Sequence, residues 1–243
     1  RQGSIAVSAS GDWEPGQEAV QLRFELNGTS DQSVGDRRLL LNASLGGITE
    51  AMPLGDGTFS ARWTPPAEVP QARTVIITAV DASAPSSITG WTSFPLLVKQ
   101  SLTFGATPDS QNVLIIGDRE RGPVRASPAG TVAFDALVHP AIRTGTLRTT
   151  LPGGRSMDVP APLPLAEYPR VSFFPQPDTI PSGSNHTILL AATTPGGEPL
   201  AKATITVQTE QATLGTAVAT NVPGVYALTT QFNGDARNVS LTA

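Results

Sequence analysis

The stretch GDGTFSARWT, residues 55–64, decides the fold class of this chain. It opens on Gly-Asp-Gly, a turn signal, because glycine and aspartate tolerate the positive φ angles that tight turns need. Phe59, Ala61 and Trp63 then alternate with polar residues. Alternation with a period of two places one face of a strand in a core and the other in water. The stretch therefore predicts a turn followed by a strand of an antiparallel sheet.

The same alternation recurs along the whole chain, with turn signals between the alternating runs. Many short strands at this spacing are typical of a sandwich or barrel. The 22 prolines are spread along the chain, and interior prolines break helices, so a helix-rich fold is excluded. The best helical candidate, residues 36–45, fits a strand at least as well. The clearest alternating runs are Ile5–Ala9, Val20–Leu26, Val132–Val138 and Ile205–Val207.

Breaks in the pattern predict three units, at residues 1–99, 100–166 and 167–243. Prolines at nearly alternate positions in residues 160–169 indicate a stiff, extended connector before the third unit. No linker separates the first two units, so we expect a strand to run almost directly from one to the next. The expected fold is all-β, with tandem immunoglobulin-like sandwich domains arranged as an elongated rod.

Three phrases resemble known modules. Residues 56–66 resemble the late hairpin of bacterial immunoglobulin-like and filamin-type repeats, and residues 114–132 resemble a hairpin repeat of proteobacterial surface proteins. The third unit is similar to invasin and intimin repeats in its Ile180-Pro-Ser-Gly, Pro195-Gly-Gly-Glu-Pro-Leu and Pro223-Gly-Val-Tyr phrases. In that resemblance, residues 203–209 and 238–243 form strands. It implies a rod-like spacer or adhesion module and carries over no catalytic or binding residue.

The composition limits the classes of partner and the cellular location that we expect. The net charge is −4 and the isoelectric point is about 5.2, whereas a nucleic-acid-binding domain needs a strongly basic face. No apolar stretch reaches the roughly 20 residues of a membrane span. The chain has no cysteine, and small eukaryotic secreted modules usually carry disulfides. We therefore expect a bacterial protein that is extracellular, associated with the outer membrane, or periplasmic. The opening residues RQGSIAVS predict the start of a mature or excised chain.

The residues for a catalytic or zinc site are too few. His139 and His186 are the two histidines, and neither has a second ligand at metal-binding spacing. A serine-histidine-aspartate triad is recognised by geometry, and no G-x-S-x-G elbow is present. We expect no enzyme activity, no catalytic residue, no cofactor and no metal, with both histidines half-exposed in strands.

Calcium is the alternative metal, because it binds clustered carboxylates in loops. Asp12 with Glu14, or Asp31 with Asp36, could supply part of such a site. Asp118 and Glu120 flank Arg119, whose positive charge opposes a cation. Solvated turn carboxylates are the preferred interpretation.

Three tryptophans are the candidates for a ligand or partner contact, because sugars and partners stack on exposed rings. Trp63 shares a face with Phe59 and is expected in the core. Trp13, in the turn of residues 11–16, is expected to present an exposed ring, and Trp91 fits either place.

These observations predict a non-catalytic structural or adhesive module of a bacterial surface or secreted protein, acting through protein contacts or as a spacer. The alternatives are a carbohydrate-binding accessory module of a larger secreted enzyme, which would contact a surface glycan, and a component of a periplasmic envelope complex. Fold alone does not choose among them.

Overall fold

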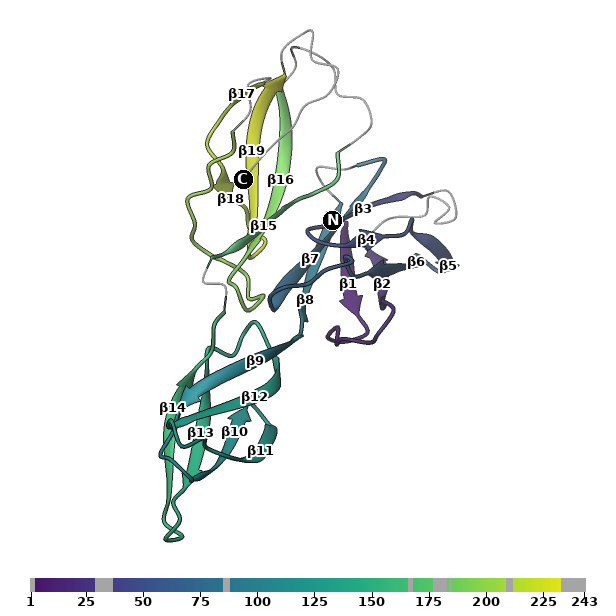
Figure 1. The fold of residues 1–243 in the computed structure, drawn as a ribbon. Helices are drawn as coiled ribbons and strands as arrows, with labels where there is room; N and C mark the ends of the chain where they lie inside the picture. Colours follow the sequence, from purple (N-terminus) through teal and green to yellow (C-terminus); the bar gives the residue numbers. More distant parts are fainter. Residues whose placement is uncertain are drawn as a thin grey trace.

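A computed structural model describes residues 3–28, 37–84, 88–165, 168–176, 183, 185–208 and 212–232 (Figure 1). Every regular element in this part of the chain is a β-strand, and the strands pair antiparallel. None of the described segments forms a helix with the length and apolar character that a membrane crossing requires. The expected all-β class is confirmed.

The N-terminal sandwich consists of β1–β8. One sheet has the order β1-β2-β6-β4, with β5 also on β6, and the other has the order β3-β7-β8. With β4 and β5 counted together as strand D and the others lettered in chain order, these sheets are A-B-E-D and C-F-G, the constant-type immunoglobulin arrangement. The bounds are β1 Ser4–Ala9, β2 Val20–Asn27, β3 Leu39–Ala43, β4 Gly47–Ile48, β5 Met52–Gly55, β6 Thr58–Thr64, β7 Arg73–Asp81 and β8 Thr89–Leu96.

The turn Asp56-Gly57 joins β5 to β6. Asp56 has φ 47° and Gly57 has φ 74°, and a two-residue hairpin turn of the primed type needs positive φ at both positions. The alternating strand that follows buries Phe59, Ala61 and Trp63. Trp63 packs edge-on against Phe94 of the opposite sheet, with ring centroids 5.0 Å apart. Its predicted core position is confirmed.

The middle sandwich consists of β9–β14 and begins one residue after β8, which fits the expected direct passage between the first two units. Its sheets are β9-β12 and β11-β10-β13-β14, and they enclose an apolar core around Leu114, Phe134 and Leu147. The bounds are β9 Val98–Gly105, β10 Gln111–Ile116, β11 Arg119–Arg125, β12 Thr131–Val138, β13 Thr144–Thr150 and β14 Ser156–Pro162.

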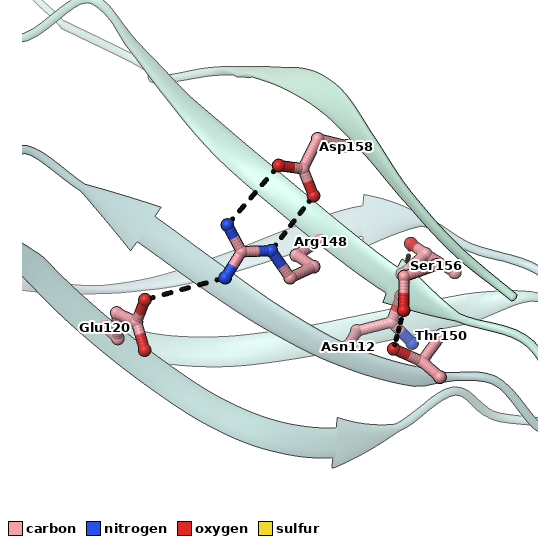
Figure 2. A network of polar contacts seen from close by, with 7 residues as sticks. Asn112, Glu120, Arg148, Thr150, Ser156 and Asp158 are labelled. Carbon is pink, nitrogen blue, oxygen red and sulfur yellow. Dashed lines mark hydrogen bonds and ion pairs between the residues drawn. The ribbon is translucent and has the colours of Figure 1, made fainter. Parts of the chain in front are cut away.

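Polar side chains link the strands of the four-stranded sheet. On its outer face, Arg148 of β13 reaches Asp158 on the neighbouring β14 at 3.1 Å and Glu120 on β11, two strands away, at 3.8 Å (Figure 2). This hydrogen bond and the charge of Asp158 raise the pKa of Arg148. On the inner face, the hydroxyl of Thr149 donates to the fully buried amide oxygen of Asn112 at 2.7 Å. The exposed pairs contribute little, whereas the buried bond satisfies a group that would be costly to leave unpaired.

The C-terminal unit consists of β15–β19, with the order β15-β16-β19-β17 and β18 also on β19. Leu190, Tyr226 and Leu228 on one face of this sheet pack with Ile205 and Val207. The strand expected at residues 203–209 is largely absent, because among its described residues only Gln208 takes part in a β-bridge. The strand expected at residues 238–243 lies outside the described residues. The bounds are β15 Arg170–Phe173, β16 Asn185–Thr193, β17 Ala212–Leu214, β18 Val218–Ala219 and β19 Val225–Phe232.

The arrangement of the units differs from the expected elongated rod. The C-terminal unit lies beside the N-terminal sandwich, and the middle sandwich projects below these two units in the view of Figure 1. A rod places consecutive units end to end, but here the third unit returns to the first. The physical reason is an apolar face on the sheet β3-β7-β8 that the N-terminal sandwich does not cover by itself.

Candidate functional site

The sheet β3-β7-β8 is buried on both faces, and β7 shows how. Val75, Ile77 and Ala79 point into the core of the N-terminal sandwich. Ile76 and Val80, between them on the opposite face, pack against the C-terminal unit. Successive side chains of a strand point to opposite faces, so one strand serves two cores.

The C-terminal unit presents a matching apolar surface. Leu189 and Ala191 of β16, Val225 of β19 and Phe174 are buried against Ile76 and Val80. Ile76 is fully buried, and full burial of a side chain of this size contributes roughly 1.5–3 kcal/mol. The contact is therefore a shared hydrophobic core rather than a loose touch between surfaces. We call it the docking interface.

Polar side chains of the N-terminal sandwich fix the position of β15 in the docking interface. The Asn42 amide donates to the carbonyl oxygen of Phe173 at 2.9 Å and to the hydroxyl of Ser172 at 3.3 Å. The Thr78 hydroxyl donates to the same Phe173 oxygen at 3.0 Å. These bonds are directional, so they set the register of β15 against β3 and β7, which apolar packing alone would leave less defined.

A second set of hydrogen bonds holds the turn Pro195-Gly196-Gly197. The Thr74 hydroxyl donates to the Pro195 oxygen at 2.7 Å, and the Ser93 hydroxyl donates to the Gly197 oxygen at 2.9 Å. A Cβ atom at Gly197 would lie 3.0 Å from Ser93 Oγ, and one at Gly196 would lie 3.1 Å from Ala141 Cβ in the middle sandwich. All three units therefore meet at this turn, and its glycines allow the close approach.

The N-terminal and middle sandwiches meet through a second contact, which we call the charged junction. Glu14 pairs with Arg119 at 2.5 Å, and Asp12 lies 3.8 Å from His139. Burial lowers the pKa of His139, while the charge of Asp12 raises it and that of Arg119 lowers it further. The Glu14–Arg119 ion pair is partly exposed, so it contributes at most about 1 kcal/mol. Asp12 and His139 form an ion pair only when the ring is protonated, which the lowered pKa of His139 opposes.

The structure places the two predicted contact residues inside the protein. The expected exposure of Trp13 is wrong: its side chain is 8% exposed, packs edge-on against Trp63 and donates from Nε1 to the Gln17 oxygen. Backbone bonds to Pro95 and from Leu97 draw this turn into the sheet edge. Trp91 is half-buried in the docking interface, where a Cβ atom at Gly224 would approach its ring within 3.0 Å. A ligand role for either ring stays a prediction.

The carboxylates and histidines considered as metal ligands do not form a common site in the described part of the chain. Glu14, offered for calcium, is paired with Arg119; Asp31 and Asp36 lie outside the described residues. Within the part of the chain that the structure describes, no three histidine or carboxylate side chains cluster as metal ligands do. His186 contacts Gln176, and burial lowers the pKa of this histidine.

Sequence reasoning missed the docking interface, although a signal for it was present. The strands that form it contain the runs VIITAV at residues 75–80 and ILLAA at residues 188–192, which do not alternate. Short continuous apolar runs are typical of strands that are covered on both faces. These runs mark both sides of the interface.

Comparisons with known proteins add no family. No known protein family and no curated protein matches the chain. Among solved structures, extracellular cadherin domains 1–4 of protocadherin gamma B7 match 97% of this chain and 85% of that chain, with 12% sequence identity and a TM-score of 0.24. At that TM-score the likeness carries no inference, so the immunoglobulin-like assignment rests on the strand order of the sheets.

Proposed function

We propose that this chain is a non-catalytic structural module of a bacterial surface or secreted protein, a spacer that acts through protein contacts. In this proposal residues 1–99, 100–166 and 167–243 are its domains. The observation that carries it is the burial of the sheet β3-β7-β8 on both faces. That burial ties the first and third units into one body, so whatever adjoins them is held at a set separation and angle.

The hydrogen bonds across the docking interface and the burial of two tryptophans support the same role. Three polar side chains at the docking interface, Asn42, Thr74 and Thr78, bond to strand and turn atoms of the C-terminal unit. Hydrogen bonds that hold two units together are expected in a structural module. Neither Trp13 nor Trp91 favours the carbohydrate-binding alternative, because Trp13 is in the core and Trp91 is half-buried against the C-terminal unit.

Single-molecule force spectroscopy tests the spacer role, with the protein pulled through tags at its two ends. A spacer must resist extension, so we expect an early event that separates the C-terminal unit from the N-terminal sandwich, followed by unfolding of the units. Ile76→Ala should weaken the early event. Ile77→Ala, on the same strand but facing the other core, should leave it in place and weaken a later one.

The proposal fails if the wild-type chain extends without a resisted event before the units unfold. It also fails if Ile76→Ala and Ile77→Ala change the same event by the same amount, because the docking interface would then bear no load of its own.

A further inference from the structure

Two arginines at one corner of the docking interface have no ion-pair partner among the described residues. Arg73 is the first residue of β7 and Arg170 is the first residue of β15, and the two line one cavity. No carboxylate in the described part of the chain lies within ion-pair distance of either guanidinium. Burial, and then the positive charge of Arg73, lower the pKa of Arg170. The two like charges are thus near each other, and no described carboxylate offsets them.

Two buried polar atoms near this corner lack hydrogen bonds. The Nε atom of Arg73 is buried and has no partner, and the same is true of the hydroxyl oxygen of Thr193. Thr193 is fully buried and is the cross-strand partner of Arg170, so both side chains lie on the face of the sheet that meets the N-terminal sandwich. A buried polar group without a hydrogen-bond partner destabilises the folded state. Arg73 lines the cavity itself, and Thr193 lies beside Arg170, which also lines it.

The cavity that these arginines line can hold a small ion. It has a volume of about 210 Å³, and a water molecule takes about 30 Å³ in the liquid. Ser44 also lines it; its hydroxyl oxygen accepts from the Ile76 backbone N–H at 2.9 Å, which leaves the hydroxyl proton available as a donor. No acidic residue is among the lining residues. From the residues that the structure describes, the cavity therefore offers donors and positive charge, and no negative charge.

We propose that a tetrahedral oxyanion, a phosphate or sulfate group, binds between Arg73 and Arg170, with the Ser44 hydroxyl as a further donor. A guanidinium presents its N–H groups in a planar fork that matches the oxygens of such a group. The anion neutralises the repulsion between the two cations, one from each unit, and so clips the N-terminal sandwich to the C-terminal unit. This inference rests on the docking interface of the proposed function.

Calorimetric titration with sodium phosphate, against sodium chloride at equal ionic strength, tests the site. We expect one phosphate per chain. Arg73→Gln and Arg170→Gln should each weaken binding about tenfold or more, since a hydrogen bond to a charged group contributes roughly 1.5–3 kcal/mol. Arg125→Gln is the matched control, because Arg125 is exposed and already paired with Asp109; its affinity should equal that of the wild type.

A second arm uses glycerol phosphate to separate two sources of the anion. Binding of both compounds indicates a terminal phosphate on a larger molecule, and binding of inorganic phosphate alone indicates a free ion; both support the site. No binding of either compound by the wild type overturns it, as does an equal loss in Arg125→Gln. An interdomain distance measurement on the same samples tells failure of this site from failure of the docking interface, since only the latter broadens the distances.

Discussion

The N-terminal sandwich contacts its two neighbours in opposite ways. Toward the C-terminal unit it presents a fully buried apolar face, crossed by hydrogen bonds from Asn42, Thr74 and Thr78. Toward the middle sandwich it presents the charged junction, in which Glu14 and Asp12 meet Arg119 and His139, and a single buried apolar side chain, Ala72. The unit next in sequence has the weaker contact, and the distant one has the stronger.

This difference follows from what each contact removes from water. Apolar burial is not weakened by salt, and buried hydrogen bonds gain strength in a medium of low polarity. Partly exposed ion pairs are screened by salt and compete with water. We therefore expect the docking interface to set the shape of the molecule, and the charged junction to adjust the angle of the middle sandwich with salt and pH.

The largest expected effect comes from neighbouring residues on β7. Ile76→Ala and Ile77→Ala should each lower the free energy of unfolding by about 2–5 kcal/mol, because both side chains are fully buried. Only Ile76→Ala should also broaden the distance between spin labels in the N-terminal sandwich and the C-terminal unit, since Ile77 faces the other core. Denaturant titration and pulsed dipolar spectroscopy measure the two quantities. Equal broadening in both variants would remove the distinction between the faces.

Gly197→Ala should cause the next largest loss of stability. Gly197 has φ +98°, and an added Cβ atom would meet Ser93 and Thr74 at 3.0 and 3.1 Å. Backbone strain and crowding together should cost about 1–3 kcal/mol. Gly153→Ala is the control, because a Cβ atom there meets nothing within 4 Å. Thermal unfolding monitored by circular dichroism compares them; a Gly197→Ala protein as stable as the control would show that the turn is not tightly held.

Removal of a hydrogen bond should have a smaller effect. Asn42→Ala deletes the amide that bonds to Phe173 and Ser172, and we expect a loss of about 1–2 kcal/mol. Combined with Thr78→Val, the loss should differ from the sum of the single changes, because both side chains donate to the same carbonyl oxygen. Denaturant titration of the four proteins gives this coupling. Strict additivity would mean that the two donors act independently.

The smallest effect concerns pH at the charged junction. The folded-state pKa of His139 is lowered, with burial as the largest cause, and its Nδ1 accepts from the Ala141 N–H at 3.0 Å. The neutral ring is thus favoured, so its contribution is present above the unfolded pKa of about 6.5 and is lost as pH falls through the lower folded value. His139→Gln should reduce the stability lost between pH 7 and 5, measured by thermal unfolding. Part of this pH-dependent loss of stability should remain in the variant, because the pKa of His186 is also lowered. A loss equal to that of the wild type would exclude His139 as a cause of the pH dependence.

The sequence was sufficient to predict the strands and much of the core. Alternation predicted the buried side chains of β2, β6 and β12, and the glycine-aspartate signal predicted the turn before β6. These features are local: they depend on the period of a strand and on the φ angles that a turn requires.

The arrangement of the units was not predicted, because it depends on pairs of surfaces far apart in the chain. Trp13 illustrates this: its turn is polar in sequence, and only the bonds to Pro95 and from Leu97 bring its ring into the core. The docking interface depends on the match between Ile76 and residues more than 90 positions later, which no local pattern reports. The two unpaired arginines became visible only once β7 and β15 were brought together.

The most direct test of the account is the separation of the N-terminal sandwich and the C-terminal unit in solution. The chain has no cysteine, so Arg23→Cys with Lys202→Cys, both at exposed positions, gives one defined pair of spin labels. Pulsed dipolar spectroscopy should show one narrow distance that is unchanged in high salt, because the docking interface is apolar. A broad distribution, or the long distance of an extended rod, would contradict the claim that the third unit docks on the first.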